Sequence, residues 1–94
     1  MNTIRLINKE DIPSVKFVSY EVLDKESDKL LRRELIEKAM ILGNSSKGKS
    51  KIFFMSEDGL LEVETTVWQA SDDLITLKGG LMIPVHCIER IELL

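Results

Sequence analysis

The sequence predicts a mainly β, α+β fold in which one amphipathic helix precedes a five-stranded antiparallel barrel. Residues 60–69 alternate as a strand does, residues 28–42 repeat apolar side chains at helical spacing, and residues 51–94 hold short apolar segments between turns. The alternation gathers the apolar and small polar side chains on one face of the strand: Leu61, Val63, Thr65, Val67 and Gln69. The opposite face carries charged, polar and aromatic side chains: Glu62, Glu64, Thr66 and Trp68.

Length and composition indicate one domain without a disulfide or a membrane span. The chain has 94 residues, of which 44% are hydrophobic and 31% are charged, as in ordinary globular proteins. The single cysteine excludes an intrachain disulfide, and no apolar run approaches the roughly 20 residues of a membrane-spanning helix. We therefore expect a single domain, residues 1–94, located in the cytoplasm and without membrane contact.

The N-terminal residues 1–23 give an ambiguous secondary-structure signal. Pro13 fixes its own φ and biases Ile12 away from the helical region, which predicts a turn. Residues 15–22 are rich in β-branched and aromatic side chains, as strands are. The segment is predicted to form a strand, and the alternative is a mobile arm that docks on the rest of the protein.

Residues 28–42 predict a helix that lies on the sheet. Apolar side chains recur along it at spacings of three and four, and most of its residues are good helix formers. Ser27 or Asp28 can cap its first amides, and Gly43 can take the left-handed conformation just past its end. Glu34 and Lys38 are four residues apart and are expected to form an ion pair.

Five short strands are predicted in the rest of the chain, at residues 51–56, 60–69, 74–78, 81–83 and 88–93. Asp58-Gly59 is a strong hairpin signal, and Gly79-Gly80 predicts a second tight turn. Pro84 ends the fourth strand because it cannot donate to the ladder. The predicted core combines the helix stripe with the inward faces of these strands: Ile36, Met40, Phe54, Val63, Val67, Leu77 and Ile91.

One helix followed by five short strands resembles the small Sm-like and SH3-like barrels. The phrase Ile83-Pro84-Val85-His86-Cys87-Ile88 is similar to the corner of strand, proline, single helical turn and strand that precedes their last strand. The resemblance implies the fold; the aspartate, asparagine and arginine-glycine of the Sm RNA-binding signature are not evident. The combination of residues 42–44, 63–68 and 77–80 also resembles short bacterial proteins of unassigned function, which implies no site.

Residues 43–50 match the Walker A pattern G-x-x-x-x-G-K-[ST] at every position. In a nucleotide site this loop follows a strand and opens a helix, so that the phosphates meet the helix N-terminus. Here the predicted helix precedes the loop, and the negative end of its dipole would face the phosphates. We therefore expect no nucleotide, and at most a weak anion or nucleic-acid site at Lys47, Lys49 and Lys51.

No catalytic, metal or cofactor site is predicted. His86 and Cys87 are neighbours whose side chains would point to opposite faces of a strand, and one histidine with one cysteine cannot build a zinc site. Cys87 is expected to be a small core hydrophobe. Glu62 and Glu64 are expected on a solvated face, so we predict that the protein is not an enzyme.

The charge distribution favours a protein partner. The net charge is −3, but residues 57–94 carry two basic and eight acidic side chains, which sum to −6. Trp68 is expected to be covered by the N-terminal arm or the helix, because tryptophan is usually well buried. The alternative is an exposed Trp68 beside Glu62, Glu64 and Thr66, which would suit a partner with basic residues. We therefore predict a non-enzymatic binding or regulatory module. The alternative function is RNA or other nucleic-acid binding through the basic loop, residues 43–51.

Self-association is also predicted, as a symmetric homodimer. Residues 88–94 form a last strand with apolar Ile91, Leu93 and Leu94 and few charges to discourage pairing at its edge. If residues 15–22 do not pair within their own chain, they can add to the edge of a second copy.

Overall fold

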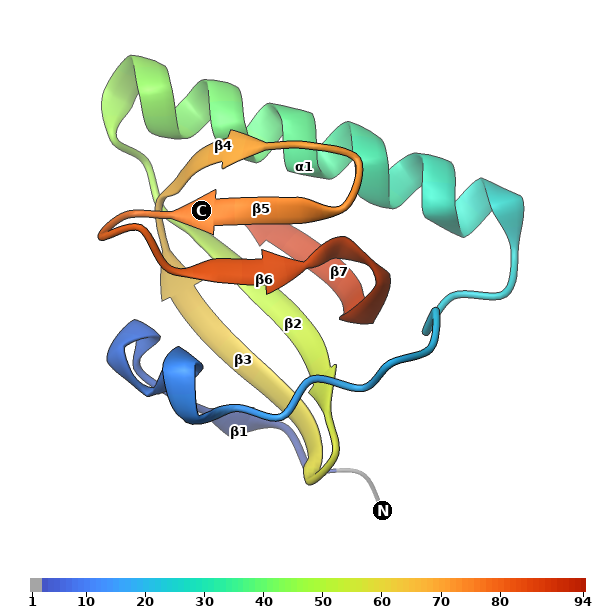
Figure 1. The fold of residues 1–94 in the computed structure, drawn as a ribbon. Helices are drawn as coiled ribbons and strands as arrows, with labels where there is room; N and C mark the ends of the chain where they lie inside the picture. Colours follow the sequence, from blue (N-terminus) through green and yellow to red (C-terminus); the bar gives the residue numbers. More distant parts are fainter. Residues whose placement is uncertain (1–2) are drawn as a thin grey trace.

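The long helix α1 (Glu26–Ser46) lies across two β-sheets in the computed structural model, which describes residues 3–94 (Figure 1). Its main contacts are with one strand of each sheet, β7 (Ile88–Leu93) in the first and β4 (Val67–Ala70) in the second. The predicted α+β class is therefore correct. Within residues 3–94, α1 and the other helical segments are too short or too polar to cross a bilayer.

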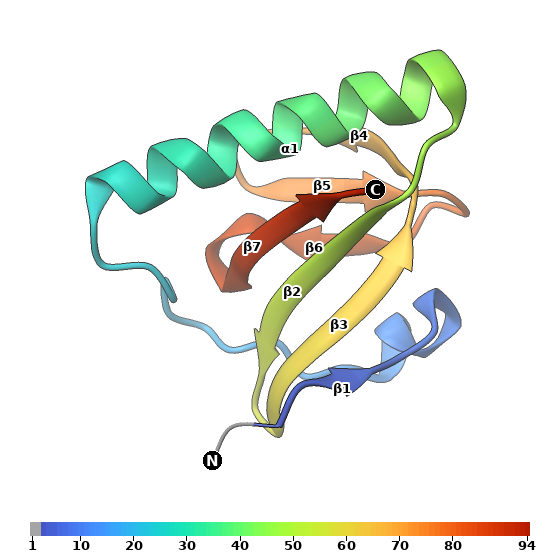
Figure 2. The ribbon, with the colours of Figure 1, turned by 180° about the vertical axis from the view of Figure 1, so that it is seen from behind.

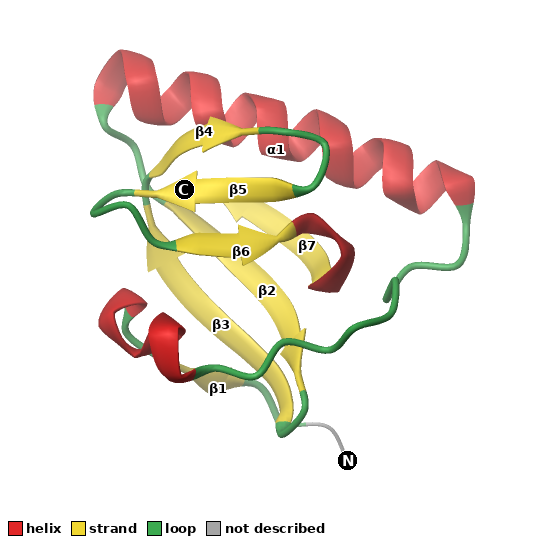
Figure 3. Ribbon diagram, in the orientation of Figure 1, coloured by secondary structure: helices red, strands yellow, loops and turns green. Residues whose placement is uncertain are grey.

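The first sheet has four strands in the order β1 (Arg5–Leu6), β3 (Gly59–Thr65), β2 (Ser50–Ser56) and β7, as Figure 2 shows. β1 runs parallel to β3, and the other pairs are antiparallel. The second sheet has three antiparallel strands, β4, β5 (Leu74–Leu77) and β6 (Met82–Pro84). Two short 3-10 helices complete the described part of the chain, η1 (Lys9–Ser14) and η2 (Val85–Cys87) (Figure 3).

The predicted strand 60–69 is bent into two strands, β3 and β4, at Thr66. Thr65, Thr66 and Val67 are all buried, so the alternation of the two faces stops where the chain passes from one sheet to the other. The backbone amide of Lys78 donates to the Thr66 carbonyl at 2.9 Å, which ties the bend to the end of β5.

The predicted closed barrel is not found in residues 3–94, although strands form near all five predicted positions. The ladders make two separate sheets, and β6 does not pair with β7. β6 is three residues long and ends at Pro84, after which η2 redirects the chain before β7 begins. Because proline lacks an amide hydrogen, it cannot extend the ladder towards closure.

The helix α1 is longer than the predicted 28–42, because Gly43 continues the helix instead of ending it. A Cβ atom at position 43 would lie 2.3 Å from the Val67 carbonyl oxygen, so glycine is needed where the helix touches β4. The left-handed residue is Lys47, with φ of 56° and its amide bonded to the Gly43 carbonyl. The N-cap is Lys25, without a side-chain cap, so the predicted capping by Ser27 or Asp28 is wrong.

The N-terminal arm, residues 3–25, pairs with β3 through β1 and then docks on the end of β2 and on η2. Residues 15–22 are extended but make one isolated bridge, Phe17 with Ser56, so the predicted strand is wrong and the docked arm is observed. The Glu57 amide donates to the Lys16 carbonyl at 2.9 Å, and Val18 is buried. Among the described strands, residues 15–22 meet only the end of β2, at Met55 and Ser56, because β3 pairs along one edge of β2 and β7 takes the other as far as Phe54.

The core fills the space enclosed by α1, both sheets and the arm. Of the predicted core, Met40 is only partly buried, and the remaining six side chains are buried: Ile36, Phe54, Val63, Val67, Leu77 and Ile91. The predicted ion pair of Glu34 with Lys38 is present at 3.3 Å.

Candidate functional site

An open groove without charged lining residues lies between α1 and the outer face of the second sheet. Its volume is about 400 Å³, and we call it the uncharged groove; its lining is Met40, Gln69, Ala70, Ser71, Leu74, Thr76 and Met82. Met40 comes from α1 and the other lining residues come from β4, β5, β6 and the turn before β5. The groove therefore depends on how the helix packs on the sheet.

The alternation of β5 and β6 places apolar side chains on both faces of the second sheet. Ile75 pairs with Ile83 and both point into the core, whereas Thr76 pairs with Met82 on the outer face. Leu74 and Met82 remain 39% and 51% exposed. An outward apolar surface on a strand whose inward face is already buried is a typical feature of a docking surface.

Trp68 lies in a β-bulge of β4, directly before the groove residue Gln69. The register steps from Val67 opposite Leu77 to Gln69 opposite Thr76, so Trp68 is the extra residue. Its side chain is 43% exposed, and its neighbour Gln69 lines the uncharged groove. A bulge redirects a side chain, which accounts for an exposed tryptophan directly after the buried Val67.

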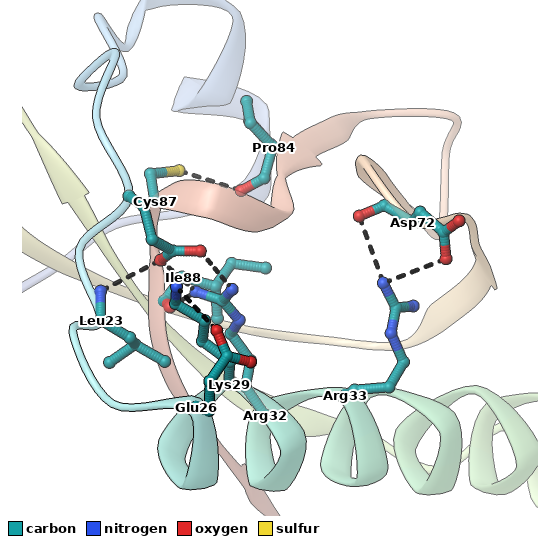
Figure 4. A network of polar contacts seen from close by, with 10 residues as sticks. Leu23, Glu26, Lys29, Arg32, Arg33, Asp72, Pro84, Cys87 and Ile88 are labelled. Carbon is teal, nitrogen blue, oxygen red and sulfur yellow. Dashed lines mark hydrogen bonds and ion pairs between the residues drawn. The ribbon is translucent and has the colours of Figure 1, made fainter.

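A second hollow, of about 450 Å³, shares Leu74 with the uncharged groove and is lined by acidic residues. Its charged lining consists of Glu21, Arg32, Asp72 and Asp73, and we call it the acidic hollow. Glu21 neutralises Arg32, and Asp72 is paired with Arg33 of α1, so among the described residues Asp73 carries the lining charge that no ion pair offsets. The Arg33 guanidinium donates to the Asp72 carbonyl at 3.2 Å and lies 3.5 Å from the Asp72 carboxylate (Figure 4). It also donates to the Ser71 carbonyl at 3.1 Å.

Arg32 and Glu21 join the helix to the arm in a partly buried ion pair, in which the Arg32 side chain is buried and the Glu21 side chain is partly exposed. The Arg32 guanidinium donates to both Glu21 carboxylate oxygens, at 2.6 and 2.7 Å, and to the Ile88 carbonyl oxygen at 3.0 Å (Figure 4). The hydrogen bond from Arg32 lowers the pKa of Glu21 from 4.5 to about 2, with a further contribution from the Leu23 amide. The pair therefore stays ionised at neutral pH and fixes one wall of the acidic hollow.

The residues predicted as an interaction surface do not share one face. Glu62 and Glu64 lie on β3 of the first sheet, where Glu64 is paired with Lys51 on β2. Thr66 is 4% exposed, and its hydroxyl donates to the Lys47 carbonyl at 3.3 Å. Trp68 belongs to the second sheet, because the bend at Thr66 separates it from the two glutamates.

The lysines of the predicted anion loop also lie apart. Lys47 ends α1 in the left-handed conformation, and Lys51 lies on β2 between Glu64 and Glu92 of the neighbouring strands. Lys49 lines a different hollow, together with Lys9 and Lys78. The Walker-type residues 43–46 are helical, so the negative end of α1 adjoins this loop, as the sequence context predicts.

His86 and Cys87 bond to different partners and do not form a catalytic pair. The Cys87 thiol is buried and donates to the Pro84 carbonyl at 3.1 Å (Figure 4), and burial raises its pKa to about 12. His86 Nε2 lies 2.7 Å from the Val18 carbonyl, which anchors the arm. A thiol with such a pKa supplies almost no nucleophilic thiolate at neutral pH. Among residues 3–94, no three His, Cys, Asp or Glu side chains gather as metal ligands would.

Sequence reasoning missed the groove residues Met40, Leu74 and Met82 and the Glu21–Arg32 pair. In a strand of four residues with three apolar side chains, the sequence does not show which residues face the core. Leu74 could therefore not be assigned to the outer face. For Arg32 a signal existed: it lies four residues before Ile36, on the apolar stripe of the helix. Comparison with protein-family models, curated proteins and solved structures finds no match, so the candidate site rests on this geometry alone.

Proposed function

We propose that the protein is a non-enzymatic binding module that recognises a partner protein through the uncharged groove. The observation that carries the proposal is the apolar outer face of the second sheet, where Leu74 and Met82 are exposed beside Met40. Trp68, a residue type enriched at binding hot spots, is exposed in the adjoining bulge. Methionines suit such a surface because their flexible side chains adapt to the partner.

The partner segment that fits combines an apolar anchor with basic side chains. The uncharged groove has no ionisable lining residue to pair with a charged anchor. The acidic hollow adjoins it at Leu74 and presents Asp72 and Asp73. Residues 57–94 carry a charge of −6, which favours the approach of a basic segment.

Short synthetic peptides test this proposal. Each peptide carries one leucine-tryptophan anchor, flanked either by lysines or by glutamates, and binding is followed by the backbone amide shifts of the full-length protein. We expect saturable shifts at Leu74, Thr76 and Met82 with the lysine-flanked peptide and weaker binding of the glutamate-flanked peptide. Leu74→Ser should weaken binding at least tenfold. Leu30→Ser, which changes an exposed leucine on the helix, is the matched control.

Amide shifts confined to other surfaces would contradict peptide binding at the uncharged groove. Equal affinity for the lysine-flanked and the glutamate-flanked peptide would contradict the proposed preference for a basic partner. Retention of nucleic acid in a salt-dependent manner would instead favour the alternative function at residues 43–51. That alternative has less support, because Lys47, Lys49 and Lys51 do not form a row along which a phosphate backbone could bind.

The likeness to the small Sm-like and SH3-like barrels is a proposal as well. Its support is the strand order β7-β2-β3 and β4-β5-β6, with a single bent strand shared by the two sheets. The helical turn η2 between Pro84 and β7 also supports it. A cytoplasmic location is proposed on the composition.

We also propose a homodimer, for which only one of the two arguments from the sequence remains. The arm packs on its own chain, so exchange of residues 15–22 does not support it. The remaining support is the exposed apolar end of the chain, Leu93 and Leu94. Sedimentation over a range of concentrations should show a dimer, and a single species near 10.7 kDa at high concentration would contradict it.

A further inference from the structure

Three lysines from distant parts of the sequence line one hollow beside the first sheet. Lys9 begins η1, Lys49 precedes β2, and Lys78 follows β5. The hollow has a volume of about 400 Å³ and also contains Glu10 and Glu64. We call it the lysine hollow.

The backbone at each of these lysines is held by a hydrogen bond to another segment. The Leu94 amide donates to the Lys49 carbonyl at 3.3 Å, and the Lys78 amide donates to the Thr66 carbonyl at 2.9 Å. Near Lys9, the Ile7 amide donates to the Glu62 carbonyl at 2.9 Å. The fold therefore holds the backbone segments that carry the three lysines around the hollow before any ligand arrives.

The lysine hollow is positive in a protein that is negative overall. Among the described residues none of its three ammonium groups lies in an ion pair, and they outnumber the two carboxylates by one. In four other hollows of the described surface the lining charges sum to zero or to a negative value. An anion is therefore favoured here more than at the other hollows.

We propose that the lysine hollow binds the phosphate group of a small molecule. Lysines act on phosphate as compact point charges, whereas carboxylates are usually bound by the planar fork of arginine, and this hollow contains no arginine. A nucleic-acid strand needs a row of cations, but Glu10, Glu64 and the negative sheet half surround this cluster. The proposal is independent of the uncharged groove, which lies against the second sheet.

Titration of the full-length protein with inorganic phosphate tests the site, at constant ionic strength maintained with chloride. We expect saturable amide shifts at Lys49, Thr66 and Lys78 that chloride alone does not produce. Lys49→Gln and Lys78→Gln should each weaken binding about fivefold, the effect of a unit charge about 4 Å away in water. Glu64→Gln should strengthen it, since it removes a repelling charge.

Lys38→Gln is the matched control, because Lys38 lies on the helix and is paired with Glu34. It should leave phosphate binding unchanged, and melting curves establish that each variant is folded. Unsaturable shifts, or equal loss of affinity in Lys38→Gln, would overturn the proposal. Tight binding of a single-stranded oligonucleotide at these amides, without saturable binding of phosphate, would also overturn it.

Discussion

The ion pair of Glu21 with Arg32 is predicted to hold the arm on the body, and Glu21→Gln tests this. A pKa lowered from 4.5 to about 2 corresponds to an upper limit of about 3.4 kcal/mol, at 1.36 kcal/mol for each pH unit. The Glu21 side chain is 32% exposed, so solvent screening reduces the effect. We expect a loss of about 2 kcal/mol at neutral pH, because Arg32 remains buried and loses its charged partner.

The direction of the pKa shift determines how the stability difference between wild type and variant changes with pH. The folded-state pKa of Glu21 is lowered, so its stabilisation is present above pH 4.5 and is lost as the pH falls from 4.5 towards 2. The Glu21→Gln variant has no ionisable side chain at this position and therefore lacks this pH-dependent stabilisation. The difference in unfolding free energy between wild type and variant should therefore shrink over that range, as the wild-type carboxylate is protonated.

Urea unfolding at several pH values measures this difference. A loss of about 2 kcal/mol should also lower the melting temperature by roughly 8–16 °C for a domain of this size. Glu26→Gln is the control, because Glu26 forms an exposed pair with Lys29 and should change stability little. A Glu21→Gln variant as stable as wild type at neutral pH, or a difference that is the same at all pH values, would refute the reasoning.

Three further predictions concern stability, and each is measured by thermal or urea unfolding. Gly43→Ala should cost about 1–3 kcal/mol, because its Cβ would lie 2.3 Å from the Val67 carbonyl; an unchanged melting temperature would contradict the close contact. Val67→Ala should cost about 2 kcal/mol by leaving a cavity, while Glu64→Ala should have little effect; equal losses would contradict the strand register. Ser50→Ala should be neutral or stabilising, since its hydroxyl is buried without a hydrogen bond among the described residues, and a loss above about 1 kcal/mol would reveal one.

Local sequence patterns predicted most of the elements, but not how two of them meet. The periodicity of α1 and the Asp58-Gly59 hairpin are local properties, and both were correctly predicted. Gly43 was assigned to the helix end because glycine is common there, whereas its role depends on the Val67 carbonyl, a tertiary contact. The bend at Thr66 could not be predicted from local sequence either, because the alternation of residues 60–69 continues through it without interruption.

The candidate site was harder to predict than the fold, because its residues come from separate segments. The acidic character of residues 57–94 and the possible exposure of Trp68 could be inferred from sequence. The groove requires Met40 of α1 and Met82 of β6 to line one hollow, and the lysine hollow requires Lys9 of η1 and Lys78 after β5 to line another. Neither arrangement has a signal in composition or periodicity.

The docked arm has a consequence for the order of events during synthesis. Residues 3–25 are synthesised well before the residues that anchor them: the Val18 carbonyl contacts His86, which follows it by 68 residues. Closing so long a loop is entropically costly until the hairpin and η2 have formed. The arm is therefore synthesised before its anchors but is among the last parts of this domain to reach its native position. Until then its apolar side chains and the surface that it covers are both exposed to other molecules.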